Sequence, residues 1–380
     1  MRSDSRQLLS VTTTLSSTMS IHERYRLSAV INAKGTNTAL GVSRSSDGVA
    51  AAVAQALPEF FVMDELGDRA SEAIAQVTGA QAGAVVHCAA AGITLSVAAT
   101  MTGGDPRRVA ALPDATDMHN RVVMPACHVV DYGHSNLQGI RLAGARVDLA
   151  GDETRCSIDD LEEELDGPDV TCLMLVSSRL TQGEPIDLVA AVRAAHRRGV
   201  PAIIDGAAQF PRIADLLATG ADLVLVSGQK YLGSPTAGLA AGTWPLVQAL
   251  RAQTRGIGRV MKPTKEAVIG VLAALEEWQA FDRMKWEADE LAKVDAFAVA
   301  ADRIPDVSAE VVQDPTGLQV SRVLLKVRDA MRVATELEAG TPSIYVMTDR
   351  VADDELMLEL VPLTDDEIAT VLARLWAILT

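Results

Sequence analysis

Several short runs of the sequence are apolar without interruption, among them Val170–Val176, Ala202–Ile204 and Leu223–Val226. Strands that are buried on both faces show this pattern, whereas strands with one solvated face alternate between apolar and polar residues. Between such runs lie longer segments in which apolar residues return every three or four positions, for example Leu188–Arg198. This succession predicts an α/β fold in which helices cover both faces of a mostly parallel sheet.

The same pattern predicts the elements on either side of this central part. Helices are expected at Gly48–Leu57, Leu66–Thr78, Ile93–Met101, Cys156–Leu165, Thr243–Arg255, Val268–Phe281 and Met284–Ala301. Strand-like runs follow at Ala309–Val312, Ser321–Val327, Ser343–Met347 and Leu356–Leu360, and a last helix is expected at Asp365–Leu379. We therefore predict a flexible leader over residues 1–20, an N-terminal segment over 21–45, a large α/β domain over 46–260 and a small α+β domain over 261–380.

Two charged residues follow neighbouring apolar runs. Asp205 directly follows the run Ala202–Ile204. The run Leu223–Val226 leads through Ser227-Gly228-Gln229 to Lys230. In doubly wound sheets, ligands bind beyond the carboxyl ends of the strands, where both residues fall. A lysine there can form a Schiff base with pyridoxal 5'-phosphate (PLP), and an acid can keep the pyridine nitrogen protonated. Singly, Asp205 would also serve as a helix N-cap and Lys230 as a surface lysine, but together they predict a PLP site.

A strand followed by a turn of small residues precedes the helix expected at Ile93–Met101. The turn contains Ala90, Ala91 and Gly92. The free backbone N–H groups and the positive dipole end of a helix N-terminus bind anions. We expect these three residues to bind the cofactor phosphate through their backbone, although tight packing alone also explains small residues.

The motifs around Asp205 and Lys230 resemble those of a known family. Asp205-Gly206-Ala207-Ala208, Ser227-Gly228-Gln229-Lys230 and the glycines and proline that follow are similar to the fold-type I PLP enzymes. The likeness is greatest to the branch of the selenocysteine synthases (seryl-tRNA selenium transferases) and the D-glucosaminate-6-phosphate ammonia-lyases, and it covers most of Ile31–Leu275. Ser234 departs from the family pattern. The resemblance implies a large domain like that of aspartate aminotransferase, PLP as the cofactor, and a homodimer or higher oligomer with sites between subunits.

Further site residues are expected from the resemblance and from their places beside the strand ends. His128 is a candidate for the residue that faces the cofactor ring or for a proton shuttle, because a neutral imidazole stacks on pyridine and titrates near neutral pH. The residues expected to bind the cofactor also include Ser177, Ala207, Gln209 and Ser227. The expected substrate-binding residues are Asn32, Thr36, Arg179, Gln182, Arg259 and Lys262. A structural histidine, turn-closing Asn and Thr residues, and a solvated cationic hinge remain the alternatives.

Composition removes several classes of partner. The chain has 34 basic and 50 acidic residues, a net charge of −16, and only 3% aromatic residues, which disfavours nucleic-acid binding. The four cysteines, at positions 88, 127, 156 and 172, have no CxxC spacing, so we expect no metal site, no disulfide framework and a cytoplasmic location. No apolar run is long enough to span a bilayer.

The Lys230 and Asp205 motifs predict an external aldimine with an amino-acid substrate and a quinonoid intermediate at Cα, but they leave the outcome open. From the resemblance we expect a lyase-like or transferase-like reaction, of ammonia-lyase or β-elimination type, on a small anionic or sugar-bearing amino acid. One alternative is PLP- and O₂-dependent oxidation of an α-amino acid, possible for nucleoside amino acids in antibiotic biosynthesis. Others are an aminotransferase and a non-enzymatic scaffold or regulator with the PLP fold. A true selenium transferase is not expected, since no basic surface or tRNA-binding N-terminal region is evident.

Overall fold

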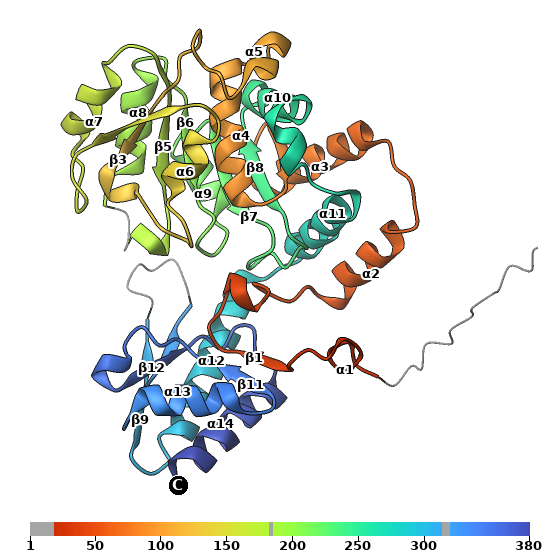
Figure 1. The fold of residues 1–380 in the computed structure, drawn as a ribbon, viewed down its shortest axis with the longest axis vertical. Helices are drawn as coiled ribbons and strands as arrows, with labels where there is room; N and C mark the ends of the chain where they lie inside the picture. The colour runs from red at the N-terminus through yellow and green to blue at the C-terminus, as the bar shows by residue number, and fades with distance from the viewer. Residues whose placement is uncertain (1–18, 182–184, 314–319) are drawn as a thin grey trace, which may run out of the picture.

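The computed structural model describes residues 19–181, 185–313 and 320–380, and its larger part is built on one sheet (Figure 1). Seven strands pair in the order β2-β8-β7-β6-β5-β3-β4. They are β2 (Ala82–Val86), β3 (Arg121–Pro125), β4 (Arg146–Ala150), β5 (Val170–Val176), β6 (Ala202–Asp205), β7 (Leu223–Ser227) and β8 (Gly238–Gly242). The strands from β7 to β4 are parallel, and β8 pairs antiparallel with β7 and β2. The predicted mostly parallel sheet is therefore confirmed.

Helices lie on both faces of this sheet. In chain order the α-helices are α1 (Ile21–Tyr25), α2 (Asp47–Ala56), α3 (Met63–Thr78), α4 (Ala89–Thr102), α5 (Pro106–Ala111), α6 (Asn136–Arg141), α7 (Ile158–Leu165), α8 (Leu188–His196), α9 (Ile213–Ala218), α10 (Trp244–Ala252), α11 (Lys265–Gln279), α12 (Arg283–Ala301), α13 (Ala330–Ala339) and α14 (Asp365–Leu379). The nine helices expected from the apolar pattern are present, with ends that shift by a few residues. Five were not predicted, of which α1, α5, α6 and α9 are too short to show a period.

The period of two along β5 explains why both faces are covered. Leu173 and Leu175 point to the face packed by α7 and α8, whereas Cys172, Met174 and Val176 point to the face packed by α4 and α6. Because each fully buried aliphatic side chain contributes about 1.5–3 kcal/mol, two layers of helices stabilise a strand that has no polar face. The uninterrupted apolar run is the direct consequence.

The smaller part contains an antiparallel sheet in the order β12-β10-β9, formed by β9 (Val307–Val312), β10 (Arg322–Val327) and β12 (Glu355–Leu358). The run expected to join this sheet at Ser343–Met347 instead forms β11 (Ser343–Tyr345), which pairs in parallel with β1 (Val30–Asn32). The N-terminal segment supplies this partner, since Ile31 and Ala33 belong to the same hydrophobic core as α12, α13 and α14. The unpredicted helix α13 buries Val333, Ala334 and Leu337, whose spacing is helical.

The two parts meet at the junction between α11 and α12. Helix α11 packs on α2 and α3 through Val268, Leu66 and Ala70, so we infer that the large domain extends through α11. At the junction, the rings of Trp278 and Phe281 stack 4.8 Å apart between centroids, and Phe210 stacks on Trp286 at 4.9 Å. In a chain with few aromatic residues, this cluster fixes the start of α12 against the loop that follows β6.

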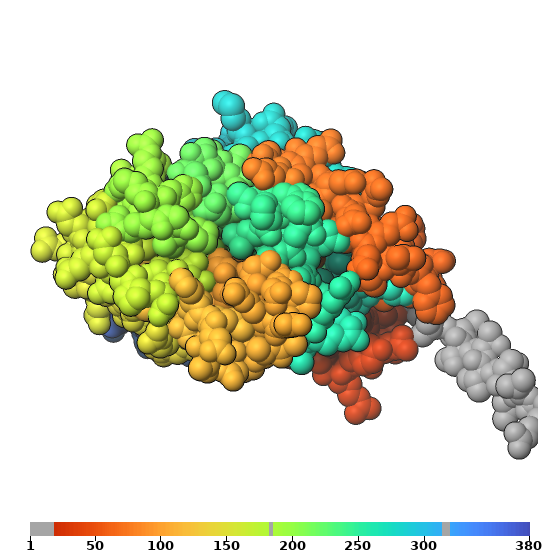
Figure 2. All heavy atoms as spheres, turned by 90° about the horizontal axis from the view of Figure 1, so that it is seen from above, coloured from red at the N-terminus to blue at the C-terminus, as the bar shows by residue number. Residues whose placement is uncertain are grey.

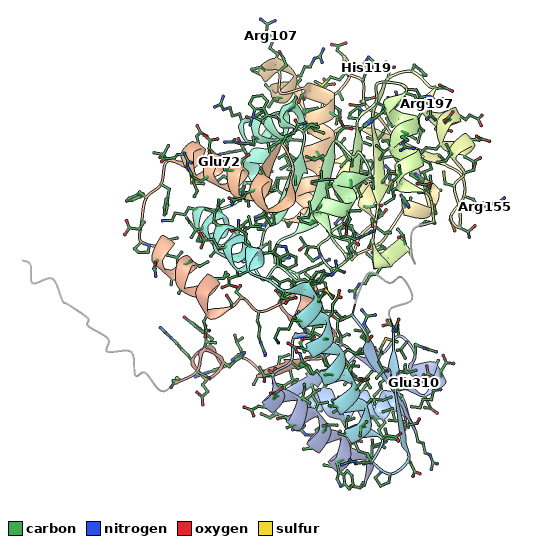
Figure 3. All side chains as sticks on the ribbon, turned by 180° about the vertical axis from the view of Figure 1, so that it is seen from behind. Glu72, Arg107, His119, Arg155, Arg197 and Glu310 are labelled. Atoms are coloured by element: carbon green, nitrogen blue, oxygen red, sulfur yellow. The ribbon has the colours of Figure 1, made fainter. Side chains whose placement is uncertain are left out.

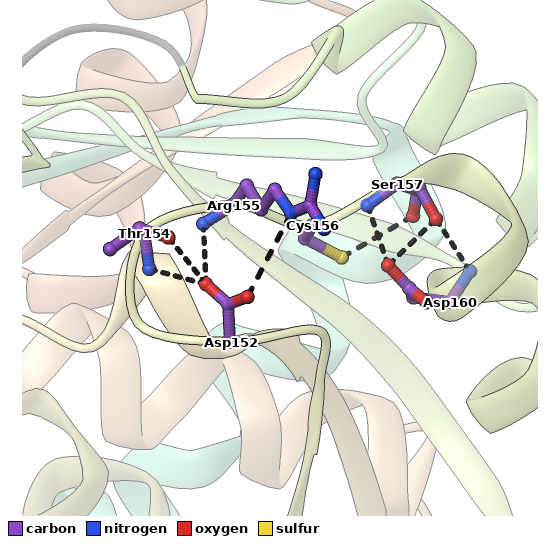
Figure 4. A network of polar contacts seen from close by, with 6 residues as sticks. All are labelled: Asp152, Thr154, Arg155, Cys156, Ser157 and Asp160. Atoms are coloured by element: carbon purple, nitrogen blue, oxygen red, sulfur yellow. Dashed lines mark hydrogen bonds and ion pairs between the residues drawn. The ribbon is translucent and has the colours of Figure 1, made fainter.

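The acidic helix expected at Cys156–Leu165 shows how local sequence sets a helix start. Ser157 accepts from the backbone N–H of Asp160, whose carboxylate accepts from the backbone N–H of Ser157 (Figure 4). This reciprocal capping box stabilises the first turn of α7 and begins the helix at Ile158. Ser157 is thus the N-cap of α7. None of the helices within the described ranges is both long and apolar enough to cross a membrane.

Candidate active site

Asp205 and Lys230 come together at the carboxyl edge of the sheet. Asp205 is the last residue of β6, and Lys230 follows the end of β7, its parallel neighbour. Burial lowers the pKa of Lys230 to about 8, the Asp205 carboxylate opposes this shift, and the Arg179 guanidinium adds to it. Burial likewise raises the pKa of Asp205, against a hydrogen bond of 3.0 Å from the backbone N–H of Ala207 and against the Lys230 charge. The fold therefore holds a buried acid beside an amine that is partly neutral near pH 8, as a nucleophilic lysine requires.

The first turn of α4 forms a cradle next to this pair. Cys88 is the N-cap: its thiol accepts from the N–H of Ala91, and its carbonyl accepts from the N–H of Gly92. The N–H groups of Ala89 and Ala90 find no partner among the described residues, because the first residues of a helix have no intrahelical acceptor. Of the three residues predicted to bind phosphate, only Ala90 has a backbone N–H without a partner among the described residues. The N–H of Ala91 donates to the Cys88 thiol, and the N–H of Gly92 donates to the Cys88 carbonyl.

A glycine on β8 makes the cradle possible. A Cβ placed on Gly238 would lie 2.7 Å from the backbone N of Ala89, which is too close for any side chain. Strand β8 was not predicted, because its sequence of glycine, alanine and leucine has little strand propensity. Its small residues instead let the N-terminus of α4 approach the sheet.

Ser177 and Gln209 are joined in a buried network with Arg212. The Gln209 amide donates to the Ser177 carbonyl (2.7 Å) and hydroxyl (3.1 Å), and Arg212 donates to the same hydroxyl (2.6 Å) and to the Gln209 amide oxygen (2.8 Å). The backbone N–H of Ser177 donates to the Asp205 carbonyl at 2.9 Å. This network ties the loop after β5 to the loop after β6 and fixes the backbone that carries Asp205. Arg212 was missed in the sequence, where only its nearness to Gln209 marks it.

His128 is fully buried at the end of the segment that follows β3. Its Nδ1 accepts a hydrogen bond of 3.1 Å from the backbone N–H of Val176, which assigns the ring proton of the neutral form to Nε2. Within the described residues, Nε2 has no hydrogen-bond partner. Burial lowers the pKa of His128 to about 4, which argues against the titration near neutral pH that the sequence suggested. A neutral ring with an unsatisfied buried N–H suits contact with a ligand better than it suits a proton shuttle.

Tyr132 lies close to both Asp205 and Cys88, and the sequence analysis did not select it. Partial burial, first, and then the negative charge at Asp205 raise its pKa to about 12. Its ring contacts that of His134 edge-on, with 4.6 Å between centroids. Tyr132 is 38% exposed, and it lies near enough to the buried acid for the Asp205 charge to act on it. Its place four residues after His128 was the available signal.

The small domain adds a second buried charge cluster, which we call the Glu359 cluster: Glu359, Arg322, Arg179 and Tyr231. Arg322 donates to Glu359 Oε2 through Nη2 (2.9 Å) and Nε (3.2 Å), and the Tyr231 hydroxyl donates to Oε1 (3.1 Å). Arg179 Nη1 lies 3.8 Å from Oε2. Burial and the Glu359 charge raise the pKa of Tyr231, so its hydroxyl stays protonated. Only Arg179 of these four was predicted as a site residue.

The N-terminal segment reaches the same place. The Asn32 side chain closes a turn: it donates to the Gly35 carbonyl at 2.8 Å and accepts from the N–H of Lys34 at 2.9 Å. These contacts agree with the alternative that Asn32 is a turn-closing residue. The turn brings Gly35 against Glu359, and the predicted site residue Thr36 follows Gly35 in the chain. Further along, the Ser43 hydroxyl donates to the Gln229 carbonyl beside Lys230. The predicted site residue Gln182 lies outside the described residues.

Arg259 and Lys262 lie elsewhere. They line a cavity of about 550 Å³ with Arg251, Arg255 and Asp64, and Asp205, Lys230 and Arg179 are not part of its lining. The cavity lies between α3 and the segment from α10 to the 3₁₀ helix η5 (Ile257–Met261), in the hollow between the orange and teal segments of Figure 2. Lys265, which follows Arg259 and Lys262 closely in the chain, donates to the carbonyls of Leu57 and Glu59. Within one chain, the fold therefore separates these cations from the Asp205–Lys230 pair.

Cys88 lies in the α4 cradle, whereas His119 lies at the surface. His119 points outward at the surface, as do the charged residues labelled with it in Figure 3. The four cysteines are free thiols, and the described residues contain no cluster of three or more His, Cys, Asp or Glu side chains arranged for a metal ion.

Comparison with known proteins gives two relatives that match along nearly the whole chain. A 5'-C-glycyluridine monooxygenase-decarboxylase from a Streptomyces species is 35% identical over 361 residues, covering 91% of this chain and 88% of the relative. A D-glucosaminate-6-phosphate ammonia lyase from Salmonella typhimurium is 32% identical over 364 residues, covering 94% and 97%. The chain belongs to the D-glucosaminate-6-phosphate ammonia-lyase-like family of fold-type I PLP enzymes.

Two further findings agree with this family. The structure of a D-glucosaminate-6-phosphate ammonia-lyase superposes with a TM-score of 0.87 at 32% identity, over 95% of this chain and 98% of the other. The profile of the SelA family, L-seryl-tRNA selenium transferase, matches residues 204–308. The resemblance noted in the sequence is thus confirmed, and so are the fold class and the assignment to enzymes.

The residues of the site fit the cofactor of this family. Lys230 offers a partly neutral amine, Asp205 a buried acid, and the first turn of α4 two open N–H groups in a cradle that Gly238 keeps clear. The unpaired Nε2 of His128 provides a buried donor at the same edge of the sheet.

Proposed function

We propose that this chain binds PLP at Lys230 and acts at Cα of an amino-acid substrate. The observation that carries the proposal is the buried Asp205–Lys230 pair on adjacent parallel strands, with both pKa values shifted toward the neutral forms. Perturbed groups of this kind concentrate where chemistry occurs. When bound, PLP supplies an electron-withdrawing ring that stabilises negative charge at the substrate Cα.

The side chains around the pair have separable tasks. The Lys230 amine, with its lowered pKa, removes or returns the proton at Cα, and the Asp205 carboxylate holds a proton on the pyridine nitrogen. The open N–H groups of Ala89 and Ala90 bind the phosphate. His128, which stays neutral, packs against the cofactor ring, and Ser177, Ala207, Gln209 and Ser227 keep the loops beneath it in place.

Arg179 is the residue that we assign to the substrate carboxylate. It lies close enough to Lys230 to affect the pKa of that amine, and its guanidinium makes no full hydrogen-bonded pair with Glu359. A planar guanidinium binds a carboxylate through two parallel N–H groups. The substrate class is thus an α-amino acid whose carboxylate meets Arg179.

For the reaction type we propose lyase-like elimination, supported by the structural match over 95% of the chain to an ammonia-lyase. Oxidative decarboxylation with O₂ is the second candidate, supported by 35% identity to a monooxygenase-decarboxylase over 91% of the chain. The two reactions differ in their products and in their need for oxygen. Both begin with the breaking of a bond at Cα, which Lys230 and Asp205 promote.

The deciding experiment incubates the PLP-loaded protein with amino acids, including sugar-acid and nucleoside amino acids, in air and under nitrogen. Ammonia release at equal rates in both supports the lyase. Oxygen uptake with CO₂ release in air alone supports the oxygenase, and amino-group transfer to a keto acid supports an aminotransferase. A protein that takes up no PLP, judged by the absence of a visible absorbance band, contradicts the whole proposal.

We also propose a homodimer in which Arg259 and Lys262 serve the site of the second copy. Their cavity is apart from Lys230 in the same chain, and Met63, which lines it, is 46% exposed. Val260, which follows Arg259 in the chain, is 88% exposed. Apolar side chains this exposed are expected at an interface. Closed two-fold symmetry would bring each cationic segment to the other subunit.

Mixed dimers test this arrangement. A Lys230→Ala subunit paired with an Arg259→Ala subunit has one intact site if Arg259 acts across the interface, and none if it acts within its own chain. Recovery of activity on mixing two inactive variants is therefore expected. No recovery, with dimers present by light scattering, would refute the assignment.

A further inference from the structure

Glu359 occupies an enclosed position at the domain boundary. Its side chain is 1% exposed, and its backbone N–H donates to the Ala33 carbonyl at 2.9 Å. Gly35, with a φ of +70°, lies against the carboxylate so closely that a Cβ there would collide with it. The N-terminal turn therefore fixes the carboxylate from one side while the arginines meet it from the other.

The two arginines of the Glu359 cluster are held unequally. Arg322 donates two hydrogen bonds to Oε2, whereas Arg179 lies 3.8 Å from the same oxygen, beyond hydrogen-bond distance. The Arg322 side chain is 12% exposed and the Arg179 side chain 25%. Arg322 is thus committed to Glu359, and Arg179 keeps its N–H groups for another acceptor.

A count of charges gives the consequence. Two arginines and one glutamate leave one positive charge, since Tyr231 is neutral and Asp205 offsets Lys230. That surplus lies on Arg179. An anionic group placed there is compensated, but a second one near Arg322 would meet the Glu359 carboxylate in a buried setting, where like charges are strongly unfavourable.

We propose that Glu359 determines specificity by limiting this part of the site to a single carboxylate. It does so by occupying Arg322, which would otherwise bind a second anionic group of the substrate. Glu359 acts through the arginines and is therefore a positioning residue. The inference rests on the proposed function, in which Arg179 binds the substrate carboxylate.

The test measures binding of propionate and succinate to the PLP-loaded protein by calorimetry, so it needs no turnover. In Glu359→Gln, Arg322 becomes free for the second carboxylate of succinate. We expect the affinity for succinate relative to propionate to rise at least about tenfold, as one added charge-assisted pair gives. Glu355→Gln is the matched control, because Glu355 is also buried and paired with an arginine, Arg350, but lies away from the site. Its ratio of succinate affinity to propionate affinity should equal that of the wild type.

A second variant predicts the opposite change and covers the case in which Glu359→Gln does not fold. In Arg322→Gln, Glu359 turns to Arg179 and neutralises it, so propionate affinity should fall at least about tenfold. An unchanged succinate-to-propionate ratio in folded Glu359→Gln, or wild-type propionate affinity in Arg322→Gln, would overturn the role of Glu359. If Arg179→Gln binds propionate like the wild type, the carboxylate assignment fails and this inference fails with it.

Discussion

Two buried charge clusters are linked through Arg179, and their surroundings affect the charges in different ways. Asp205 and Lys230 come from adjacent strands of one sheet, and burial shifts the pKa of each toward the neutral form. The Glu359 cluster comes from four segments of both domains, and hydrogen bonds from Arg322 and Tyr231 satisfy its carboxylate. The Asp205–Lys230 pair is incompletely compensated and therefore reactive. The Glu359 carboxylate is fully hydrogen-bonded and therefore holds its neighbours in position.

The difference shows how one fold combines chemistry with positioning. A reactive lysine has to lose its proton near neutral pH, so it cannot have a strong, close carboxylate partner. A buried arginine and glutamate need such pairing, because an unpaired buried charge is strongly unfavourable. Arg179 belongs to both clusters: it helps to lower the pKa of Lys230 and lies 3.8 Å from Glu359.

The largest effect is expected at the reactive cluster. Lys230→Ala removes the amine that binds PLP and moves the Cα proton, so the visible cofactor band should disappear and turnover should fall by about 10²–10⁴-fold or more. Absorbance and product assays measure both. Turnover near the wild-type rate in this variant would refute the central assignment.

Asp205→Asn should lower turnover by about 10²–10³-fold while the fold is retained, because the amide can still accept the N–H of Ala207 but has no negative charge for the pyridine nitrogen. Circular dichroism checks the fold, and steady-state rates check the effect. An unchanged rate would disprove the charge role of Asp205.

At the fixed cluster the expected effect is on stability. Arg322→Met removes both arginine hydrogen bonds to Glu359, and Arg179 replaces that pairing only in part, so the free energy of unfolding should fall by about 3 kcal/mol or less. Urea unfolding of this variant beside the surface variant Arg332→Met, which loses an exposed pair with Glu336, provides the comparison. Equal losses in the two would show that Glu359 is not held as the structure has it.

The pKa of Lys230 allows a test by pH. In the protein without PLP, acylation of Lys230 followed by mass spectrometry should rise with a midpoint near pH 8, whereas Lys285, whose pKa is raised by its hydrogen bond to Asp289, should react only at higher pH. The unfolded chain holds more protons than the folded one between about pH 8 and 10.5, so the stability of the wild type relative to Lys230→Met should rise with pH in that window. A shared midpoint for the two lysines would contradict the burial of Lys230.

The smallest expected change concerns His128. Because burial lowers its pKa to about 4, its ring resonances should stay constant between pH 5.5 and 8 in nitrogen NMR spectra. Titration of His128 within that range would restore it as a candidate proton shuttle.

Local patterns in the sequence were enough to predict the reactive cluster and the sheet that carries it. Val170–Val176 is a strand at the predicted residues, and α14 spans the predicted Asp365–Leu379, since uninterrupted apolar runs and helical periods report burial directly. Asp205 and Lys230 could be paired in advance because parallel strands that are neighbours end at the same edge. The glycine-rich strand β8 and the helix α13 were missed, the first for want of any strand propensity.

The fixed cluster depended on the tertiary structure. Glu359, Arg322 and Tyr231 stand in unrelated segments, and nothing in their local sequence marks an arginine for one carboxylate rather than another. The parallel pairing of β1 with β11 brings Gly35 against Glu359, which is a long-range event that no short pattern encodes. Charge pairing between distant segments is decided by which cores pack together, whereas strand ends and helix starts are decided by the residues next to them.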